Sequence, residues 1–281
     1  MDRLQKLGEL KCGDAVATQL KKISGRTIDR ALAREKRVRH LQRDRNPSVH
    51  RLIWQQVPVK AASEWETSEV GNVHVDYVAH CGRSAGGSGL YTLSAVEIAT
   101  NWWEGEAIPA WSQQTTNEGI GRMLERFPFR LPETHPDNDS GLVNDLLWEW
   151  ARRWKIRMSE SRPYKRNDNA WVEHENRTRV RKIAGYWRFD TTGEMRLLNE
   201  LYGVLRLSKN FCLPTIRLAG KERVGDRIKR TYDKARTPYQ RLLESKQVPE
   251  ANKEELNTIY ESLNPAALSR QIAELRGRLE A

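Results

Sequence analysis

The sequence predicts an α/β fold in which a mixed five-stranded sheet is flanked by helices. Residues 72–80, 89–100 and 102–109 read as three strands, the first with clear alternation of apolar and polar side chains. Two further extended segments, within residues 128–135 and 155–161, each follow a segment with helical periodicity, and another helix begins near Asn167. Three strands, two helix–strand steps and a helix follow the order of a ribonuclease H-like core.

The connecting segments support this order. Residues 115–127 are helical, and residues 141–154 form an amphipathic helix with Leu142, Leu146, Trp150 and Trp154 on one stripe. The Gly-rich segment 82–89 lacks the Lys-Ser/Thr ending of a phosphate-binding loop, so we interpret it as a hairpin turn. We expect Trp102 and Trp103 to pack in the core rather than stack on bases.

The region before the sheet is basic and helical. Residues 12–38 form two short helices around a turn at Ser24 and Gly25, which resembles a helix-turn-helix with residues 26–38 as its recognition helix. An ordinary helical hairpin with a solvated basic face fits this pattern equally well. The predicted divisions are a helix-turn-helix-like segment (1–40), a linker (41–66), the sheet core (67–192) and a helical, basic C-terminal region (193–281).

Charge is segregated along the chain. The net charge is +11, which favours a polyanionic partner. Residues 21–51 hold 11 basic and 3 acidic residues, residues 66–145 hold 4 basic and 12 acidic, and residues 152–188 hold 12 basic and 4 acidic. The acidic block is suited to cations and the basic blocks to phosphates.

Several other classes are disfavoured. Three widely spaced cysteines, Cys12, Cys81 and Cys212, argue against a disulfide framework and fit a reducing cytoplasm. Zinc-ligand spacings and long apolar runs are missing from the sequence, so we expect neither a structural zinc nor a membrane partner. His74 and His80, which flank Asp76, are expected to serve structure rather than a metal.

Three carboxylates are brought together by the predicted topology. Asp76 lies on the first strand, Asp137 just after the fourth strand, and Glu173 one turn into the helix that follows the fifth. Two Mg²⁺ or Mn²⁺ ions need carboxylates from different rigid elements, and such a pair supports in-line displacement at a phosphodiester.

Basic residues surround the predicted carboxylate site. Arg177 and Arg181 lie four and eight residues beyond Glu173, so α-helical spacing places them on roughly one face. We expect the flanking residues Arg162, Lys165, Arg166, Arg177 and Arg181 to bind DNA phosphates. Arg26, Arg30 and Arg34, on the outward face of the helix-turn-helix-like segment, are expected to contact DNA as well.

The segments "HVDYVAHCG", "HPDNDSGLVN" and, above all, "SRPYKRNDNAWVEHENRTRVRKIAGYWRF" resemble the integrase catalytic core of DDE-type insertion-sequence transposases, which are relatives of retroviral integrases. The resemblance spans about residues 20 to 245 and includes the 35-residue interval between Asp137 and Glu173. It implies that Asp76, Asp137 and Glu173 hold the metal, with Asn138, Asn167 and Asn169 shaping the motifs around them. It also implies a homo-oligomer that binds terminal repeats and target DNA on the cytoplasmic nucleoid.

The sequence departs from that group at several positions, one of which is Leu142 in place of a usual aromatic residue. Asp139 replaces a usual Gly, Glu97 a usual Asp, and Asn101 another usual Gly. Glu175 replaces a usual Lys, and at an exposed position it would weaken contact with the DNA backbone. These departures make a catalytically decayed or truncated copy that only binds DNA the alternative to a transposase. A nuclease that hydrolyses without joining strands is a third possibility for a ribonuclease H-like fold.

Overall fold

The computed structural model describes residues 12–24, 27, 30, 57–60, 64–82, 89–110, 112–136, 145–161, 170–224 and 227–280. The chain divides into two compact units, 1–48 and 49–281. In the first, the helix α2 (Asp14–Lys22) is described. Ser24 then accepts the Thr27 amide through both its carbonyl and its hydroxyl oxygen, as expected at the start of a second helix.

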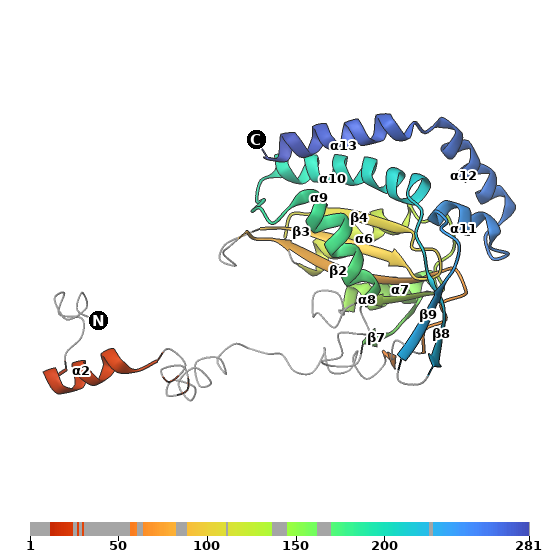
Figure 1. Ribbon diagram of the computed structural model, residues 1–281. Coiled ribbons are helices and arrows are strands. Elements are labelled where there is room, and N and C mark those ends of the chain that lie inside the picture. The colour runs from red at the N-terminus through yellow and green to blue at the C-terminus, as the bar shows by residue number, and fades with distance from the viewer. Residues whose placement is uncertain are drawn as a thin grey trace. The chain divides into compact units, whose positions relative to one another are not determined.

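The second unit is built on a five-stranded sheet (Figure 1). The strands are β2 (Asn72–His80), β3 (Leu90–Glu97), β4 (Trp103–Ile108), β5 (Glu133–Pro136) and β6 (Arg157–Met158), in the spatial order β4-β3-β2-β5-β6. β2, β3 and β4 form an antiparallel meander, whereas β5 and β6 run parallel to β2. This order and these directions confirm the predicted ribonuclease H-like core.

Helices cover the sheet because its strands are apolar on both faces. The covering elements are α6 (Gln113–Leu124), α7 (Asp145–Trp154), α8 (Ala170–Glu175), η3 (Asn176–Arg181), α9 (Lys182–Ala184) and α10 (Thr192–Leu207). Val73 and Val75 belong to one buried cluster with Ile120 and Met123 of α6. Val78 belongs to a second cluster, which includes residues of α10. Alternation along β2 therefore places Asp76 on the face that α10 covers.

The C-terminal region packs on this core. It contains η4 (Ser208–Cys212), the strands β8 (Leu218–Val224) and β9 (Arg227–Tyr232), α11 (Pro238–Glu244), α12 (Glu250–Ser262) and α13 (Pro265–Glu280). In Figure 1, α10 lies between the sheet and α13, and it contacts both. Both clusters include residues beyond 193, so the structure has no packing boundary there. The β8–β9 hairpin interrupts a region predicted to be helical.

Local signals explain where the helices begin. Thr191 and Glu194 form a capping box at α10, and Thr237 and Gln240 form another at α11. A short parallel pair joins β1 (Val59–Lys60), which lies in the predicted linker, to β7 (Glu160–Ser161), which lies at the end of the predicted extended segment 155–161. Within the described ranges, the structure contains no helix that is both long and apolar enough to cross a membrane.

Candidate active site

Asp76 lies in the middle of the central strand and is half-buried. Its Oδ1 accepts the amide hydrogen of Tyr77 at 2.7 Å, and its Oδ2 accepts a hydrogen bond from Asn176 Nδ2 at 2.7 Å. Asn176 begins η3, three residues beyond Glu173. One side-chain contact therefore ties the first predicted carboxylate to the helical segment that carries the third.

Glu173 extends from α8, which packs against β2 and β3. Its side chain is exposed, whereas that of Val172, the preceding residue, is 1% exposed and holds the helix on the sheet. Glu173 is thus an accessible carboxylate on an anchored helix, which is what binding a polyanion through a cation requires.

Asp137 lies outside the described residues. The strand that leads to it is described, and it pairs with β2 in a fixed parallel register: His135 lies opposite His74, and Pro136 lies opposite Val75. The last described residue before Asp137 is therefore paired with the residue immediately before Asp76.

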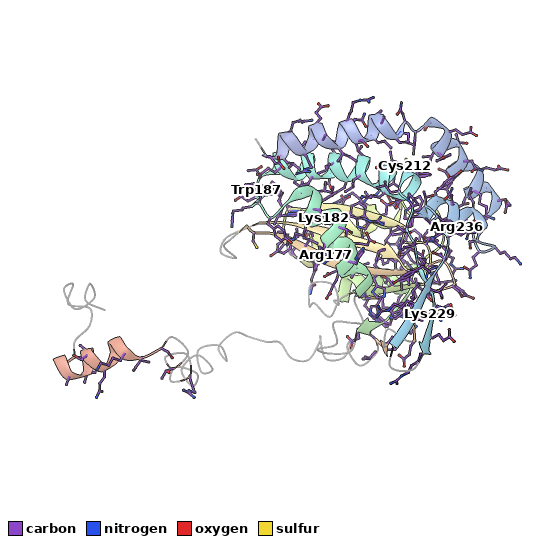
Figure 2. All side chains as sticks on the ribbon, in the orientation of Figure 1. Arg177, Lys182, Trp187, Cys212, Lys229 and Arg236 are labelled. Carbon is purple, nitrogen blue, oxygen red and sulfur yellow. The ribbon has the colours of Figure 1, made fainter. Side chains whose placement is uncertain are left out.

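Other predicted site residues divide into two groups. Arg30, Arg177 and Arg181 are described; Arg30 and Arg177 are exposed, and Arg177 is visible in Figure 2 on the same helical segment as Lys182. The remaining predicted residues lie outside the described ranges: Arg26, Arg34, Asn138, Arg162, Lys165, Arg166, Asn167 and Asn169.

Arg181 does not share the exposed face of Arg177. It is half-buried, donates from its guanidinium to the Ala79 carbonyl at 2.8 Å and lies 5.0 Å from the ring centre of Tyr186. Residues 176–181 are π-helical rather than α-helical, with i→i+5 hydrogen bonds. The two arginines therefore differ in accessibility: Arg177 is exposed, whereas Arg181 is partly occupied by the backbone of β2. Phosphate binding by these two residues stays a prediction.

Glu175 is buried, contrary to the expectation that it would face DNA. Its side chain is 7% exposed and forms an ion pair with Arg179, whose side chain is 4% exposed. The Arg179 guanidinium also lies 5.9 Å from the ring centre of Trp103. The acidic substitution at position 175 thus belongs to the core, where it removes no phosphate contact.

A buried cluster of three rings lies beside β2 and β5. The rings of Trp65, His74 and His135 lie within 4.2–4.7 Å of one another, centre to centre. His135 Nδ1 lies 3.2 Å from Ser159 Oγ, which donates to Glu133 at 2.7 Å. This cluster packs β2 against β5 two residues before Asp76, so His74 serves structure as expected, and His135 shares that role.

His80 is also structural. Its Nε2 lies 2.7 Å from Thr92 Oγ1, which lies 2.7 Å from the Tyr202 hydroxyl. Burial, together with the positive charge of Arg181, lowers the pKa of His80 to about 4. Trp102 and Trp103 are 1% and 0% exposed, and both pack in the core as expected.

The β3–β4 turn accounts for two of the sequence departures, Glu97 and Asn101. The Glu97 carboxylate is buried and accepts the amides of Gly71, Ala99 and Thr100 at 2.8–3.2 Å. Asn101 has φ of 64°, a conformation that favours Gly but that Asn tolerates better than most residues. Both residues therefore serve the turn.

Sequence reasoning missed Asn176, which orients Asp76. Its position three residues after Glu173 was the available signal, because residues three apart on a helix are neighbours. Among the described side chains, no three His, Cys, Asp or Glu converge as a metal site. Asp76 and Glu173 are thus the described members of the predicted set.

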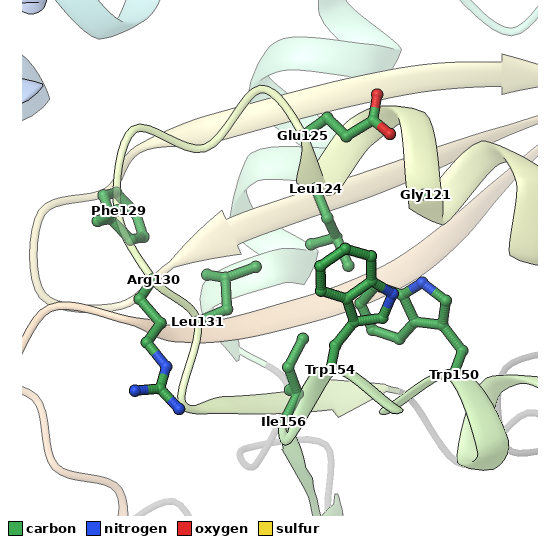
Figure 3. Close-up of a pocket in the computed structure, with 9 residues that line it drawn as sticks. All are labelled: Gly121, Leu124, Glu125, Phe129, Arg130, Leu131, Trp150, Trp154 and Ile156. Carbon is green, nitrogen blue, oxygen red and sulfur yellow. The ribbon is translucent and has the colours of Figure 1, made fainter. Parts of the chain in front are cut away.

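An apolar pocket of about 260 Å³ lies away from these carboxylates (Figure 3). Neither Asp76 nor Glu173 lines it. Its lining residues come mainly from α6, α7 and the loop after α6: Gly121, Leu124, Glu125, Phe129, Arg130, Leu131, Trp150, Trp154 and Ile156. It is therefore separate from the candidate active site.

The chain resembles known proteins in sequence and in structure, as two examples show. No protein-family profile matches the chain. An uncharacterized protein of Sinorhizobium fredii, y4rM, is 31% identical over 229 residues, which are 82% of this chain and 65% of that protein. The chain thus spans slightly less than two thirds of that relative. The catalytic core domain of BIV integrase matches with a TM-score of 0.42 and 17% identity, over 64% of this chain and 95% of the integrase chain. The fold assignment itself follows from the strand order and directions.

Proposed function

We propose that the protein is a divalent-metal-dependent DNA strand transferase of the transposase or integrase type, which cuts element ends and joins them to target DNA. The observation that carries this proposal is the 2.7 Å hydrogen bond from Asn176 to Asp76. It fixes the strand of one carboxylate to the helix of another. The described part of β5 ends at Pro136, immediately before Asp137 in the sequence, and Pro136 pairs with Val75, the residue before Asp76.

The donor set fits Mg²⁺ or Mn²⁺, since all three predicted ligands are carboxylates and hard cations prefer oxygen. When bound, two such ions would activate the attacking hydroxyl and stabilise the charge of the leaving oxygen. Asp76, Asp137 and Glu173 would hold them. The Asp76 carboxylate accepts hydrogen bonds from the Tyr77 amide and from Asn176 Nδ2, and these two contacts orient it.

DNA would reach the carboxylates along the exposed side of the α8–η3 segment. Arg177 is exposed there, and Arg162, Lys165 and Arg166 precede the segment in the sequence. Arg26, Arg30 and Arg34 would contact the element ends. Arg181 would support the site by holding the Ala79 carbonyl. The proposal includes oligomerisation on DNA, because two ends must be joined, and a cytoplasmic, nucleoid-bound location.

The test is a strand-transfer assay with labelled end duplexes, a plasmid target and Mn²⁺. Asp76→Asn, Asp137→Asn and Glu173→Gln should each lower the rate on the order of 10³-fold, because losing one ligand removes several kcal/mol of transition-state stabilisation. Glu118→Gln, at an exposed position on α6, is the matched control and should remain active.

Other outcomes would identify the alternatives. Metal-dependent cleavage without joined product would indicate a nuclease that uses water. DNA binding that is equal in all variants, with no product from the parent protein at any metal concentration, would indicate a DNA-binding remnant with a dead site.

A further inference from the structure

The β8–β9 hairpin is a strongly basic and exposed ribbon. Residues 217–236 contain 8 basic and 3 acidic residues. The strands pair in antiparallel register, with Glu222 opposite Lys229. The described side chains between 222 and 232 are all exposed, among them Arg223, Lys229 and Arg230. Tyr232 and Leu218, which lie opposite each other, are 54% and 44% exposed.

The base of this ribbon is held firmly. Asp233 accepts the Arg217 amide at 2.7 Å and the Arg241 guanidinium at 2.6 Å. Arg241 donates further to the Thr215 carbonyl at 2.8 Å, and Arg217 donates to the carbonyls of Ala99 and Thr67. An isolated two-stranded hairpin is marginal in water, so these bonds give the ribbon a fixed root.

That root lies near the start of the central strand. Arg217 binds the turn at Ala99, and the neighbouring Ile98 amide donates to the Asn72 carbonyl at 2.9 Å, where β2 begins. Asp76 is four residues further along β2, roughly 13 Å away at the usual strand rise. This distance corresponds to about four base pairs of a duplex.

We propose that the β8–β9 ribbon is a second DNA-binding element that enters the major groove of the duplex held at the carboxylates. The proposal rests on the DNA substrate proposed above, but not on catalytic competence. A two-stranded ribbon fits that groove, and its clustered cations are complementary to the flanking phosphates. Leu218 and Tyr232 add apolar surface for base edges.

The test compares two triple variants that each remove three exposed positive charges. R223A/K229A/R230A alters the ribbon, and R270A/R276A/R278A alters α13. Among the described residues, the control removes the ion pairs Arg276–Glu280 and Arg278–Glu200, which are exposed and contribute little to stability. Fluorescence anisotropy would follow binding to a DNA duplex of about 30 base pairs, in EDTA and over a range of salt concentrations.

The ribbon variant should bind the DNA duplex at least tenfold more weakly than the parent protein. Its slope of log affinity against log salt concentration should be smaller in magnitude by roughly 2–3, because each lost phosphate contact contributes about 0.9 to that slope. The control variant should match the parent protein. Equal effects in the two variants, or none in either, would overturn the proposal. An equal loss on duplex RNA would also overturn it, because the deep, narrow major groove of A-form RNA excludes a ribbon.

These results are separable from the test of strand transfer, because binding is measured without metal. A parent protein that joins no DNA, yet loses affinity through the ribbon variant, would refute the enzyme and leave the ribbon assignment standing. Efficient strand transfer by the parent protein, together with unchanged DNA affinity in the ribbon variant, would support the enzyme and refute the ribbon assignment.

Discussion

At position 175 a carboxylate lies where the sequence suggested a solvent-facing charge. The Glu175 and Arg179 side chains are both almost fully buried and paired with each other. Burial lowers the pKa of Arg179, while the negative charge of Glu175 acts in the opposite direction and favours the charged guanidinium. Either partner alone would be an uncompensated buried charge.

Removing one partner should therefore be costly. Arg179→Met should lower the free energy of unfolding by about 3–5 kcal/mol, whereas the double variant E175L/R179M should recover most of that loss. Urea denaturation of the parent protein, both single variants and the double variant gives the coupling energy. If the single-variant losses simply added in the double variant, the two residues would not depend on each other.

The β3–β4 turn is an element whose conformation depends on two polar residues. The Glu97 carboxylate accepts hydrogen bonds from the backbone amides of the turn. Asn101 adopts the left-handed conformation, two residues before β4 begins at Trp103. An alanine in that conformation is strained, while a glycine is not. Because Arg217 binds the Ala99 carbonyl, the same turn also holds the ribbon.

Substitutions at Asn101 should separate strain from side-chain contacts. Asn101→Ala should lower the free energy of unfolding by about 1 kcal/mol, and Asn101→Gly should not lower it. Thermal and urea unfolding measure both. A loss of equal size in the two variants would mean that the Asn101 side chain, rather than its φ angle, stabilises the turn.

Across the whole molecule, two buried groups give opposite dependences of stability on pH. His80 has its pKa lowered to about 4, so the unfolded chain binds the proton first and stability falls as pH drops from 6.5 toward 4. Burial raises the pKa of Glu160 from 4.5 to about 7, so the folded chain holds the extra proton and stability falls as pH rises between those values. The two effects oppose each other between pH 4.5 and 6.5.

Replacing one of these two residues should reveal the pH dependence of stability that the other contributes. Glu160→Gln should show a steeper fall in unfolding free energy than the parent protein between pH 6.5 and 4.5, with the His80 contribution approaching about 3 kcal/mol. His80→Gln should shift the pH dependence in the opposite direction. Urea denaturation at several pH values measures both, and curves parallel to the parent would contradict these assignments.

Local periodicity was enough to predict the strands of the central sheet and their order along the chain. Apolar residues such as Val73, Val75 and Val78 recur because each must face one of the two buried sides of the sheet. The burial of Glu175 was not predictable this way, since an acid in a basic run looks solvated until its partner is seen. The π-helical turn has no residue signature. The basic residues of the β8–β9 ribbon concealed its strand periodicity, because both of its faces carry exposed side chains.

The Glu175–Arg179 pair also bears on how such chains diverge. A lysine at position 175 together with Arg179 would bury two like charges side by side, which is unfavourable. A change at one of these positions is therefore expected to require a change at the other. Descendants that keep this fold should change them together, exchanging an acid and Arg for a cation and a neutral or acidic residue. A lineage that carries Lys at 175 and still retains Arg at 179 would need a third, compensating change nearby.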